Sequence, residues 1–150
     1  MSTKVTERDT GWNALKKSLR SFGNQKVSVG VRGTVDFSAP TTAALAAVHE
    51  FGSHDGKIPE RSFLRSTFDK NEKKYKKAAK ALAVSAAKRK GSVNLSLLGE
   101  VVRADVIDAI RNREIKQSLA ASTTARKGDA PALIDTGRLI QSIESKVERA

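Results

Sequence analysis

Two helical segments in the middle of the chain constrain the fold more than any other feature. In residues 61–89, large apolar side chains recur every seven residues, at Phe68, Tyr75 and Leu82. Residues 95–113 form a second helical pattern, with an apolar stripe of Leu95, Leu98, Val102, Val106 and Ile110. Gly91 breaks the pattern between them. Because the break is short, we expect the two helices to lie antiparallel as a hairpin.

Two short segments have the pattern of β-strands. Lys26–Arg32 alternates strictly, with its valines on one face, which is typical of a half-buried strand. Residues 144–149 alternate more weakly and are expected to form an edge strand beside residues 27–31. We therefore predict an α+β fold, in which a small, mainly antiparallel sheet packs against the long helical hairpin and an extended loop is left over.

Two shorter helices are predicted before the hairpin. Residues 10–22 place Trp12, Leu15, Leu19 and Phe22 at helical spacing, and Gly23 ends the helix. A tryptophan on such a face usually belongs to the core, so we expect Trp12 to be buried. Residues 41–50 form an alanine-rich helix capped by Thr41 or Thr42.

The length of 150 residues suits one domain, 1–150. Within it, residues 1–9 are expected to be a flexible N-terminus. Residues 115–130 have little periodicity, are rich in Ser, Thr and Ala, and are predicted to be a long loop or arm. Loops of this length are usually functional or disordered.

The charge of the chain is strongly unbalanced, with 28 Lys+Arg against 16 Asp+Glu and a net charge of +12. A basic protein is attracted to nucleic acid, to membrane surfaces or to acidic proteins. Much of the excess lies on one face of the 61–89 helix. The chain has no cysteine, which excludes disulfides. It has neither an apolar run of about 20 residues nor a secretory signal, so no membrane partner is expected.

The Asp-Thr-Gly triplets at residues 9–11 and 135–137 match the catalytic loop of aspartic proteases, in which two carboxylates share a proton. Their context argues against catalysis. The first triplet follows a polar segment, and the second is followed at once by Arg138-Leu-Ile-Gln, which begins a helix. We instead expect Asp135 or Thr136 to cap this last short helix.

The other possible metal-binding and phosphate-binding residues do not have the spacing that such sites require. His49, Glu50, His54 and Asp55 do not form the H-E-x-x-H pattern of a zinc site. The glycines near residue 30 do not precede a helix as phosphate-binding glycines do. We therefore expect no catalytic residues, no metal and no cofactor, and predict that the protein is not an enzyme.

Two sequence blocks together resemble a known family. The first is Val48-His-Glu-Phe-Gly52, followed by Ile58-Pro-Glu-Arg-Ser-Phe-Leu-Arg65. The second contains Thr123-Thr-Ala-Arg-Lys-Gly128, Pro131-Ala-Leu-Ile-Asp-Thr-Gly-Arg-Leu139 and Ser142-Ile143. In this order and spacing they are similar to the small neck and tail-completion proteins of tailed bacteriophages, also called virion morphogenesis proteins. The resemblance covers about residues 27–147, but Ser118-Leu119 replaces the usual Pro-Leu, and residues 70–114 match only in helical character.

This resemblance implies a structural virion protein that joins head and tail and is assembled in the host cytoplasm. It implies a ring of six copies, with twelve as the alternative, around the DNA channel and in contact with DNA. The neighbours would be connector or head-closure proteins and tail-tube or tail-terminator proteins. The residues expected to serve interaction or structure are Glu50, Phe51, Gly52, Pro59, Arg61, Phe63, Arg65, Arg126, Lys127, Asp135, Thr136 and Gly137.

Within the first block, apolar residues are expected to anchor the start of the long helix in the core; they are Phe51, Ile58, Phe63 and Leu64. Arg61 and Arg65 are expected to face a partner or a carboxylate. The alternative function is that of a basic nucleic-acid-binding protein, supported by the net charge and the lysine-rich face. Scarce aromatic residues and the lack of a recognised nucleic-acid-binding motif argue against it.

Overall fold

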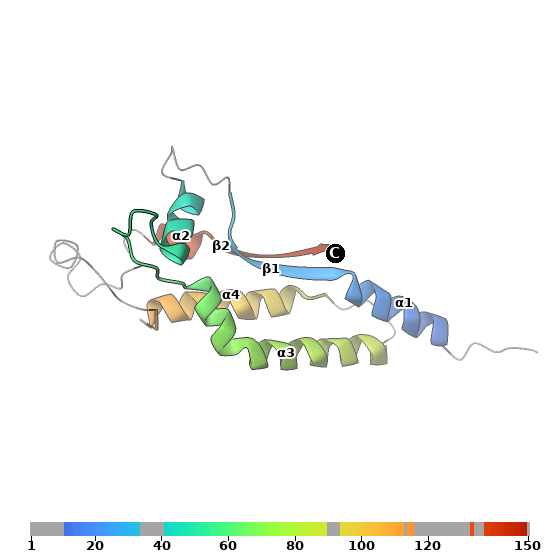
Figure 1. The fold of residues 1–150 in the computed structure, drawn as a ribbon. Helices are drawn as coiled ribbons and strands as arrows, with labels where there is room; N and C mark the ends of the chain where they lie inside the picture. Colours follow the sequence, from blue (N-terminus) through green and yellow to red (C-terminus); the bar gives the residue numbers. More distant parts are fainter. Residues whose placement is uncertain are drawn as a thin grey trace, which may run out of the picture.

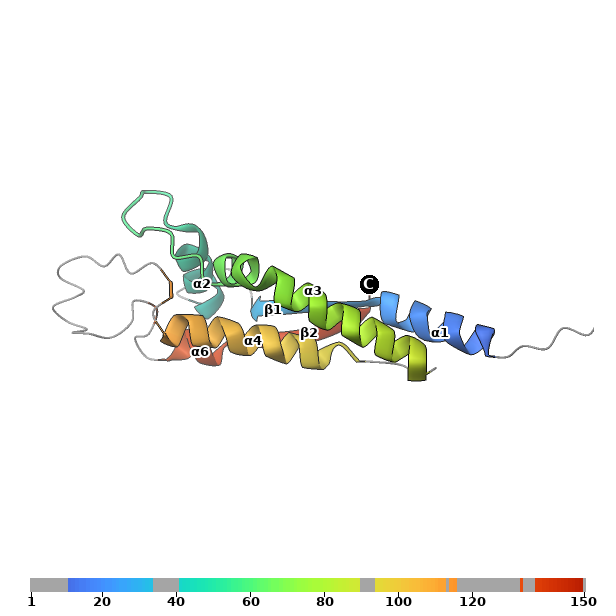
Figure 2. The same ribbon diagram turned by 90° about the horizontal axis from the view of Figure 1, so that it is seen from below.

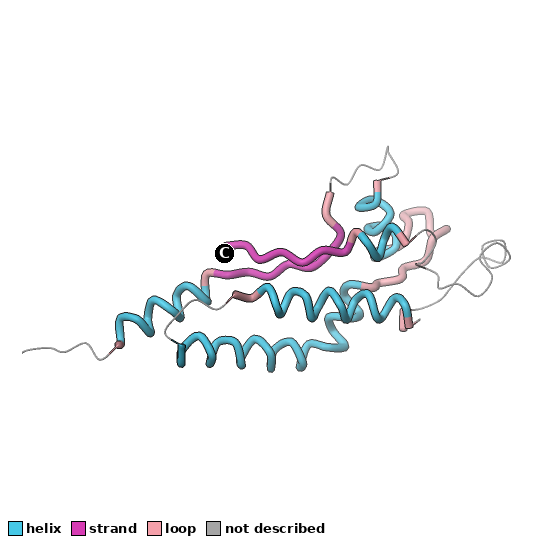
Figure 3. Tube along the Cα trace, turned by 180° about the vertical axis from the view of Figure 1, so that it is seen from behind, coloured by secondary structure: helices cyan, strands magenta, loops and turns pink. Residues whose placement is uncertain are grey.

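The structure is a computed structural model that describes residues 11–33, 41–89, 94–112, 114–115, 133 and 137–149. Its elements, in chain order, are α1 (Trp12–Gly23), β1 (Gln25–Val31), α2 (Thr42–Phe51), α3 (Leu64–Arg89), α4 (Ser96–Arg111), α6 (Arg138–Gln141) and β2 (Ile143–Arg149). The molecule is elongated, with the β1–β2 ribbon lying along the α3–α4 hairpin (Figure 1). Helix α1 lies at one end, and α2 and α6 lie at the other (Figure 3).

The sheet consists of two antiparallel strands, β1 and β2, in a register that pairs Val27 with Val147 and Val31 with Ile143. This confirms the predicted pairing of the two segments. Because paired residues point to the same face of a sheet, one face of the ribbon carries the valines. The other face carries charged residues, where Arg32 forms ion pairs with Glu144 and Glu148.

The apolar face of the ribbon packs closely on α4. A Cβ atom at Gly99 would lie 3.1 Å from Val27 Cγ1 and 3.1 Å from Ser145 Cβ, so the absence of a side chain lets helix and ribbon meet. Arg103 Nε donates a hydrogen bond of 2.6 Å to the Ile143 carbonyl, which joins the helix to the start of β2.

Helices α3 and α4 lie side by side, as predicted (Figure 2). Asp105 of α4 holds them together, because its carboxylate accepts hydrogen bonds from Lys74 Nζ at 2.7 Å and Tyr75 Oη at 2.9 Å. Burial, together with the neighbouring Asp105 carboxylate, raises the pKa of Tyr75 above its ordinary value. Lys70 pairs with Glu114 across the same hairpin.

The core lies toward the end of the molecule that holds α2 and α6. It gathers residues from α2, the C-terminal half of α4, α6 and β2, together with three residues outside the helices and strands, one of which immediately precedes α3. The core residues are Ala46, Phe63, Val106, Ala109, Ile110, Ile115, Leu133, Ile140 and Ile143. Thr41 caps α2 through a hydrogen bond from the Ala44 N–H, as predicted. Among the described helices, none is long and apolar enough to cross a membrane.

Two expectations about the helices are wrong. Helix α3 begins at Leu64 rather than Arg61. The Arg61 N–H donates to the His49 carbonyl at 2.8 Å, which holds residue 61 against the end of α2, and the Glu50 carboxylate accepts from the N–H groups of Phe63 and Leu64, where the helix starts. Trp12 is 62% exposed rather than part of the core. Helix α1 buries Ser18 instead, whose Oγ donates to the Ala86 carbonyl of α3 at 2.8 Å, and this leaves the centre of its apolar stripe turned outward.

Candidate functional site

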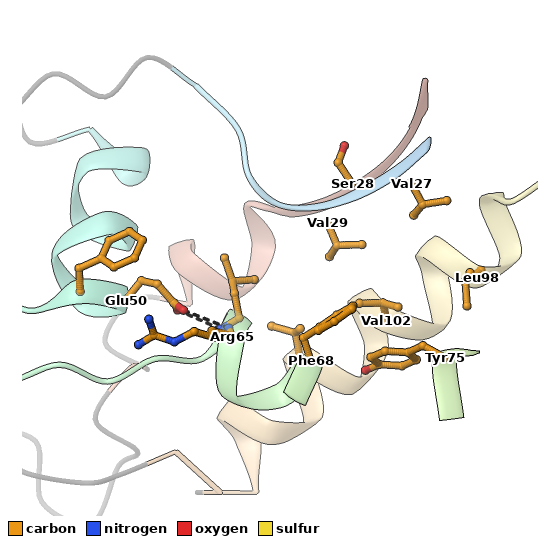
Figure 4. A pocket seen from close by; sticks show the side chains of 12 residues that line it. Val27, Ser28, Val29, Glu50, Arg65, Phe68, Tyr75, Leu98 and Val102 are labelled. Carbon is orange, nitrogen blue, oxygen red and sulfur yellow. Dashed lines mark hydrogen bonds between the residues drawn. The ribbon is translucent and has the colours of Figure 1, made fainter. Parts of the chain in front are cut away.

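The corner between α2 and α3 is organised around one buried carboxylate. Glu50 is 5% exposed, although its side chain is acidic. Its Oε2 accepts hydrogen bonds of 2.9 Å from the backbone N–H groups of Phe63 and Leu64. Its Oε1 accepts from Ser62 Oγ at 2.7 Å and from the Arg65 N–H at 3.0 Å. Figure 4 shows the side chain reaching from α2 to the start of α3.

These contacts make Glu50 the cap of a helix to which it does not belong. The first N–H groups of an α-helix have no partner within the helix, and the helix dipole favours negative charge there. Glu50 satisfies them from 13 to 15 residues earlier in the chain. The direction in which α3 leaves the corner is therefore tied to α2.

The connection from α2 to α3 folds back on itself at Gly52. Gly52 has a φ of 80°, and a Cβ atom there would lie 3.1 Å from the Glu60 backbone nitrogen. Glycine is therefore needed both for the left-handed conformation and for the close approach of the two chain segments. Ser53 closes the loop, because its N–H donates to the Ile58 carbonyl at 2.9 Å.

Residues of the connection divide into buried anchors and exposed side chains. Phe63 is 0% exposed and lies in the core, with Leu64 packed against it, as predicted. Arg61 is also buried, and burial lowers the pKa of its guanidinium. Arg65 is exposed and faces the carboxylate of Glu60, which agrees with the prediction that it faces a carboxylate.

Phe51 and Ile58 were expected to be buried, and this expectation is wrong. Phe51 is 70% exposed, and Ile58 is exposed as well. Neighbouring residues on a helix point about 100° apart, so when Glu50 points inward to cap α3, Phe51 must point away. The inward position at the end of α2 is thus occupied by the acidic residue and not by the aromatic one.

An open apolar groove of about 640 Å³ lies beside this corner. Its walls come from β1, the end of α2, α3 and α4, and no residue of β2 contributes, so it follows the edge of β1 that is not paired with β2. The lining residues are Val27, Ser28, Val29, Glu50, Phe51, Leu64, Arg65, Phe68, Tyr75, Leu98, Val102 and Val106. Valine, leucine and aromatic side chains point into it (Figure 4).

Phe68 is an exposed apolar side chain of the groove lining. It is 49% exposed, and its ring lies 5.6 Å from that of Tyr75, tilted by 41°. The seven-residue repeat placed Phe68 on the same stripe as buried Tyr75. Phe68 instead lines the open groove beside β1, so part of its ring remains exposed to solvent.

The structure brings together five of the predicted site residues at the corner, Glu50, Gly52, Arg61, Phe63 and Arg65, with Phe51 and Pro59 at its exposed surface. Gly137 lies elsewhere, at the N-cap position of α6 with a φ of 73°. Arg126, Lys127, Asp135 and Thr136 lie outside the described residues, so the proposed capping by Asp135 or Thr136 stays a prediction.

Sequence reasoning missed the capping role of Glu50 and the groove. The sequence shows how far Glu50 lies from the predicted start of the long helix. No local sequence pattern, however, indicates that a carboxylate in one helix caps the next helix. Within the described part of the chain, no group of three or more His, Cys, Asp or Glu residues could hold a metal ion. The arrangement is a hydrogen-bonded corner beside an open apolar groove.

Comparison of the chain with protein-family models, with curated proteins and with solved structures found no match.

Proposed function

We propose that the chain is a structural protein of the neck of a tailed-phage virion, where it joins head and tail as part of an oligomeric ring. One observation carries this proposal: the two halves of the first sequence block meet in space. Glu50 of Val48-His-Glu-Phe-Gly52 caps the helix that starts within Ile58-Pro-Glu-Arg-Ser-Phe-Leu-Arg65. The block that resembles the neck proteins therefore has a defined structural task, which supports a shared corner rather than a chance match.

The groove supplies a means of assembly. It is apolar and open, and Phe51 and Phe68 expose aromatic surface at it. Clustered exposed apolar residues commonly mark interaction sites. In a ring, each subunit must present a surface that receives its neighbour.

Helix α1 is the segment that we assign to the groove of the neighbouring copy. Part of its apolar stripe is turned outward, with Trp12 62% exposed and Leu19 exposed as well. It lies at the end of the molecule opposite α2, away from the groove mouth that Phe51 borders (Figure 1). Two different apolar surfaces at separate places on one chain allow head-to-tail contacts between copies. Such contacts generate a ring when the rotation from each subunit to the next brings the last subunit back to the first.

The experiment uses two single variants of the full chain, Phe68→Glu in the groove and Trp12→Glu in α1. Both side chains are substantially exposed, so the substitutions should leave the fold intact, which circular dichroism can verify. A matched control is Val84→Glu, which adds the same charge at another exposed apolar position of α3. Mass photometry then gives the distribution of oligomers.

The proposal predicts that Phe68→Glu and Trp12→Glu each fail to form rings, whereas Val84→Glu resembles the unmodified protein. Mixing the two defective variants should give a one-to-one dimer and nothing larger, because each variant retains the surface that the other has lost. Rings formed by either single variant alone would refute the contact between α1 and the groove.

A further inference from the structure

The lysines of α3 separate into two sets that the sequence does not distinguish. One set is neutralised within the molecule: Lys70 pairs with Glu114, Lys74 with Asp105, and Lys76 with Glu72. The other set, the α3 lysine stripe, consists of Lys73, Lys77, Lys80 and Lys88. These four are exposed and form no ion pair with any residue that the structure describes.

The α3 lysine stripe occupies one face of the helix. Its members are separated by four, three and eight residues, close to whole numbers of helical turns. At about 1.5 Å per residue the stripe extends over about 22 Å. Val84 lies on the same face and is the apolar residue that interrupts it.

Few acidic residues of the same helix offset this charge. Residues 73–89 contain lysine and arginine but no aspartate or glutamate, and Asp69 and Glu72, the acidic residues of α3, both lie before the first lysine of the stripe. Helix α1 packs on the same half of α3 through Ser18 and Ala86. It adds Lys16, Lys17 and Arg20, also without an acidic residue. This end of the molecule is therefore a concentrated positive surface, which attracts a polyanion.

The composition of the stripe selects among polyanions. Protein interfaces are depleted in lysine and enriched in aromatic residues and arginine at their centres. Single-stranded nucleic acid is bound through aromatic side chains on which bases stack, and the stripe has none. The exposed Trp12 of α1 has Lys16 Nζ 5.5 Å from its ring centroid and is the residue that the proposed assembly places in the groove of the neighbouring copy. Lysine point charges in a row suit duplex phosphates, and a straight surface of about 22 Å spans the axial length of about six base pairs at about 3.4 Å each.

We propose that the α3 lysine stripe binds the phosphate backbone of duplex nucleic acid without reading its sequence. This goes beyond the proposed assembly role, because the stripe is present on a single copy and its binding requires no ring. Each lysine that neutralises a phosphate releases a condensed counterion. The affinity should therefore fall steeply as salt is added, with a logarithmic slope to which the four lysines contribute about −3.6.

The test measures binding of the full chain to a fluorescent duplex of mixed sequence by anisotropy, between about 50 and about 200 mM salt. In the stripe variant, Lys73, Lys77, Lys80 and Lys88 are all replaced by Gln. The matched control removes the same charge at exposed positions elsewhere, by replacing Lys26, Lys57, Arg111 and Arg138 with Gln. A third variant replaces the four stripe lysines with Arg. Melting temperatures verify that all variants are folded.

We expect the stripe variant to lose about tenfold or more in affinity at the lowest salt and to show a salt slope shallower by about 3.6, with the Arg variant binding as the unmodified protein does. Equal losses in the stripe variant and the control would mean that net charge alone is responsible, and would overturn the assignment. Stripe-dependent binding that is tighter for a single strand, for polyglutamate or for anionic lipid vesicles than for the duplex would overturn the choice of partner.

Discussion

The carboxylate of Glu50 accepts a hydrogen bond of 2.9 Å from the backbone N–H of Phe63, whose own side chain is completely buried in the core. One contact thus links the end of α2, the start of α3 and the centre of the core. The exposed neighbours of this pair, Phe51 and Phe68, border the groove to which we assign the adjacent subunit. The stability of the corner and the geometry of the docking surface are therefore connected.

Replacing Glu50 should destabilise the protein strongly. Glu50→Ala leaves the N–H groups of Phe63, Leu64 and Arg65 without the oxygen that they bind, and hydrogen bonds to a charged group are the more costly ones to lose. We expect a loss of about 3 kcal/mol in the free energy of unfolding, measured by urea denaturation. The control is Glu60→Gln, which breaks only an exposed ion pair and should change stability by less than about 0.5 kcal/mol. Equal effects of the two substitutions would contradict the capping role.

Two phenylalanines of the same block should respond very differently to truncation. Phe63→Ala removes a ring that is 0% exposed and should cost about 3–5 kcal/mol. Phe51→Ala removes a ring that is 70% exposed and should cost less than about 0.5 kcal/mol while weakening ring assembly. Thermal melting compares the two variants. A Phe51→Ala protein that melts as low as Phe63→Ala would show that Phe51 belongs to the core.

Tyr75 should make the stability depend on alkaline pH. Its pKa is raised above 10.0 in the folded state, first by burial and then by the Asp105 carboxylate. The folded protein therefore retains the phenol proton at a pH where the unfolded chain has lost it. The resulting contribution to stability is complete below about pH 10 and is lost as the pH rises through the folded-state pKa.

The chain contains a single tyrosine, so phenolate absorbance reports Tyr75 alone. We expect the absorbance to rise well above pH 10 in the native protein and near pH 10 in denaturant. When the pH is raised through the same alkaline range, the free energy of unfolding of Tyr75→Phe should fall less than that of the unmodified protein. A native titration curve that coincides with the denatured one would mean that the phenol is accessible to solvent and not bound to Asp105.

Gly99 should be intolerant of a side chain because the ribbon lies against it. A Cβ atom there would contact Val27 and Ser145 at 3.1 Å, so Gly99→Leu must push the ribbon away from α4, at a cost of about 3 kcal/mol. Gly23→Leu is the matched control, since no atom lies within 4 Å of the corresponding position at the end of α1. If both variants unfold at the same denaturant concentration, the close packing of α4 on the ribbon is wrong.

The predictable parts of the fold are the segments in which apolar residues recur at a regular spacing. The valines of β1 alternate, and the stripe of α4 recurs at helical spacing, so the strand pairing and the hairpin followed from local pattern. Hydrophobicity also placed Phe63 correctly in the core. The same rule failed for Phe51 and Trp12, because a period identifies an apolar face but not whether another element covers that face.

The candidate site was only partly predictable for a related reason. Glu50 and Gly52 were identified as part of a motif, but the task of Glu50 depends on where α3 starts in space, which no local spacing encodes. The groove is lined by residues from β1, α2, α3 and α4, so it depends on how these elements are arranged in space. The division of the α3 lysines also became visible only when Asp105 and Glu114 were placed opposite Lys74 and Lys70.

The most direct test of the proposed function is the position of the protein in an assembled particle. Antibody Fab fragments raised against the full chain would be bound to intact tailed particles produced by cells that carry the gene, and the label located by electron microscopy. The account predicts label in a ring at the junction of head and tail, and particles without tails when the gene is deleted. Label on the capsid surface, or tailed particles that assemble normally without the protein, would contradict it.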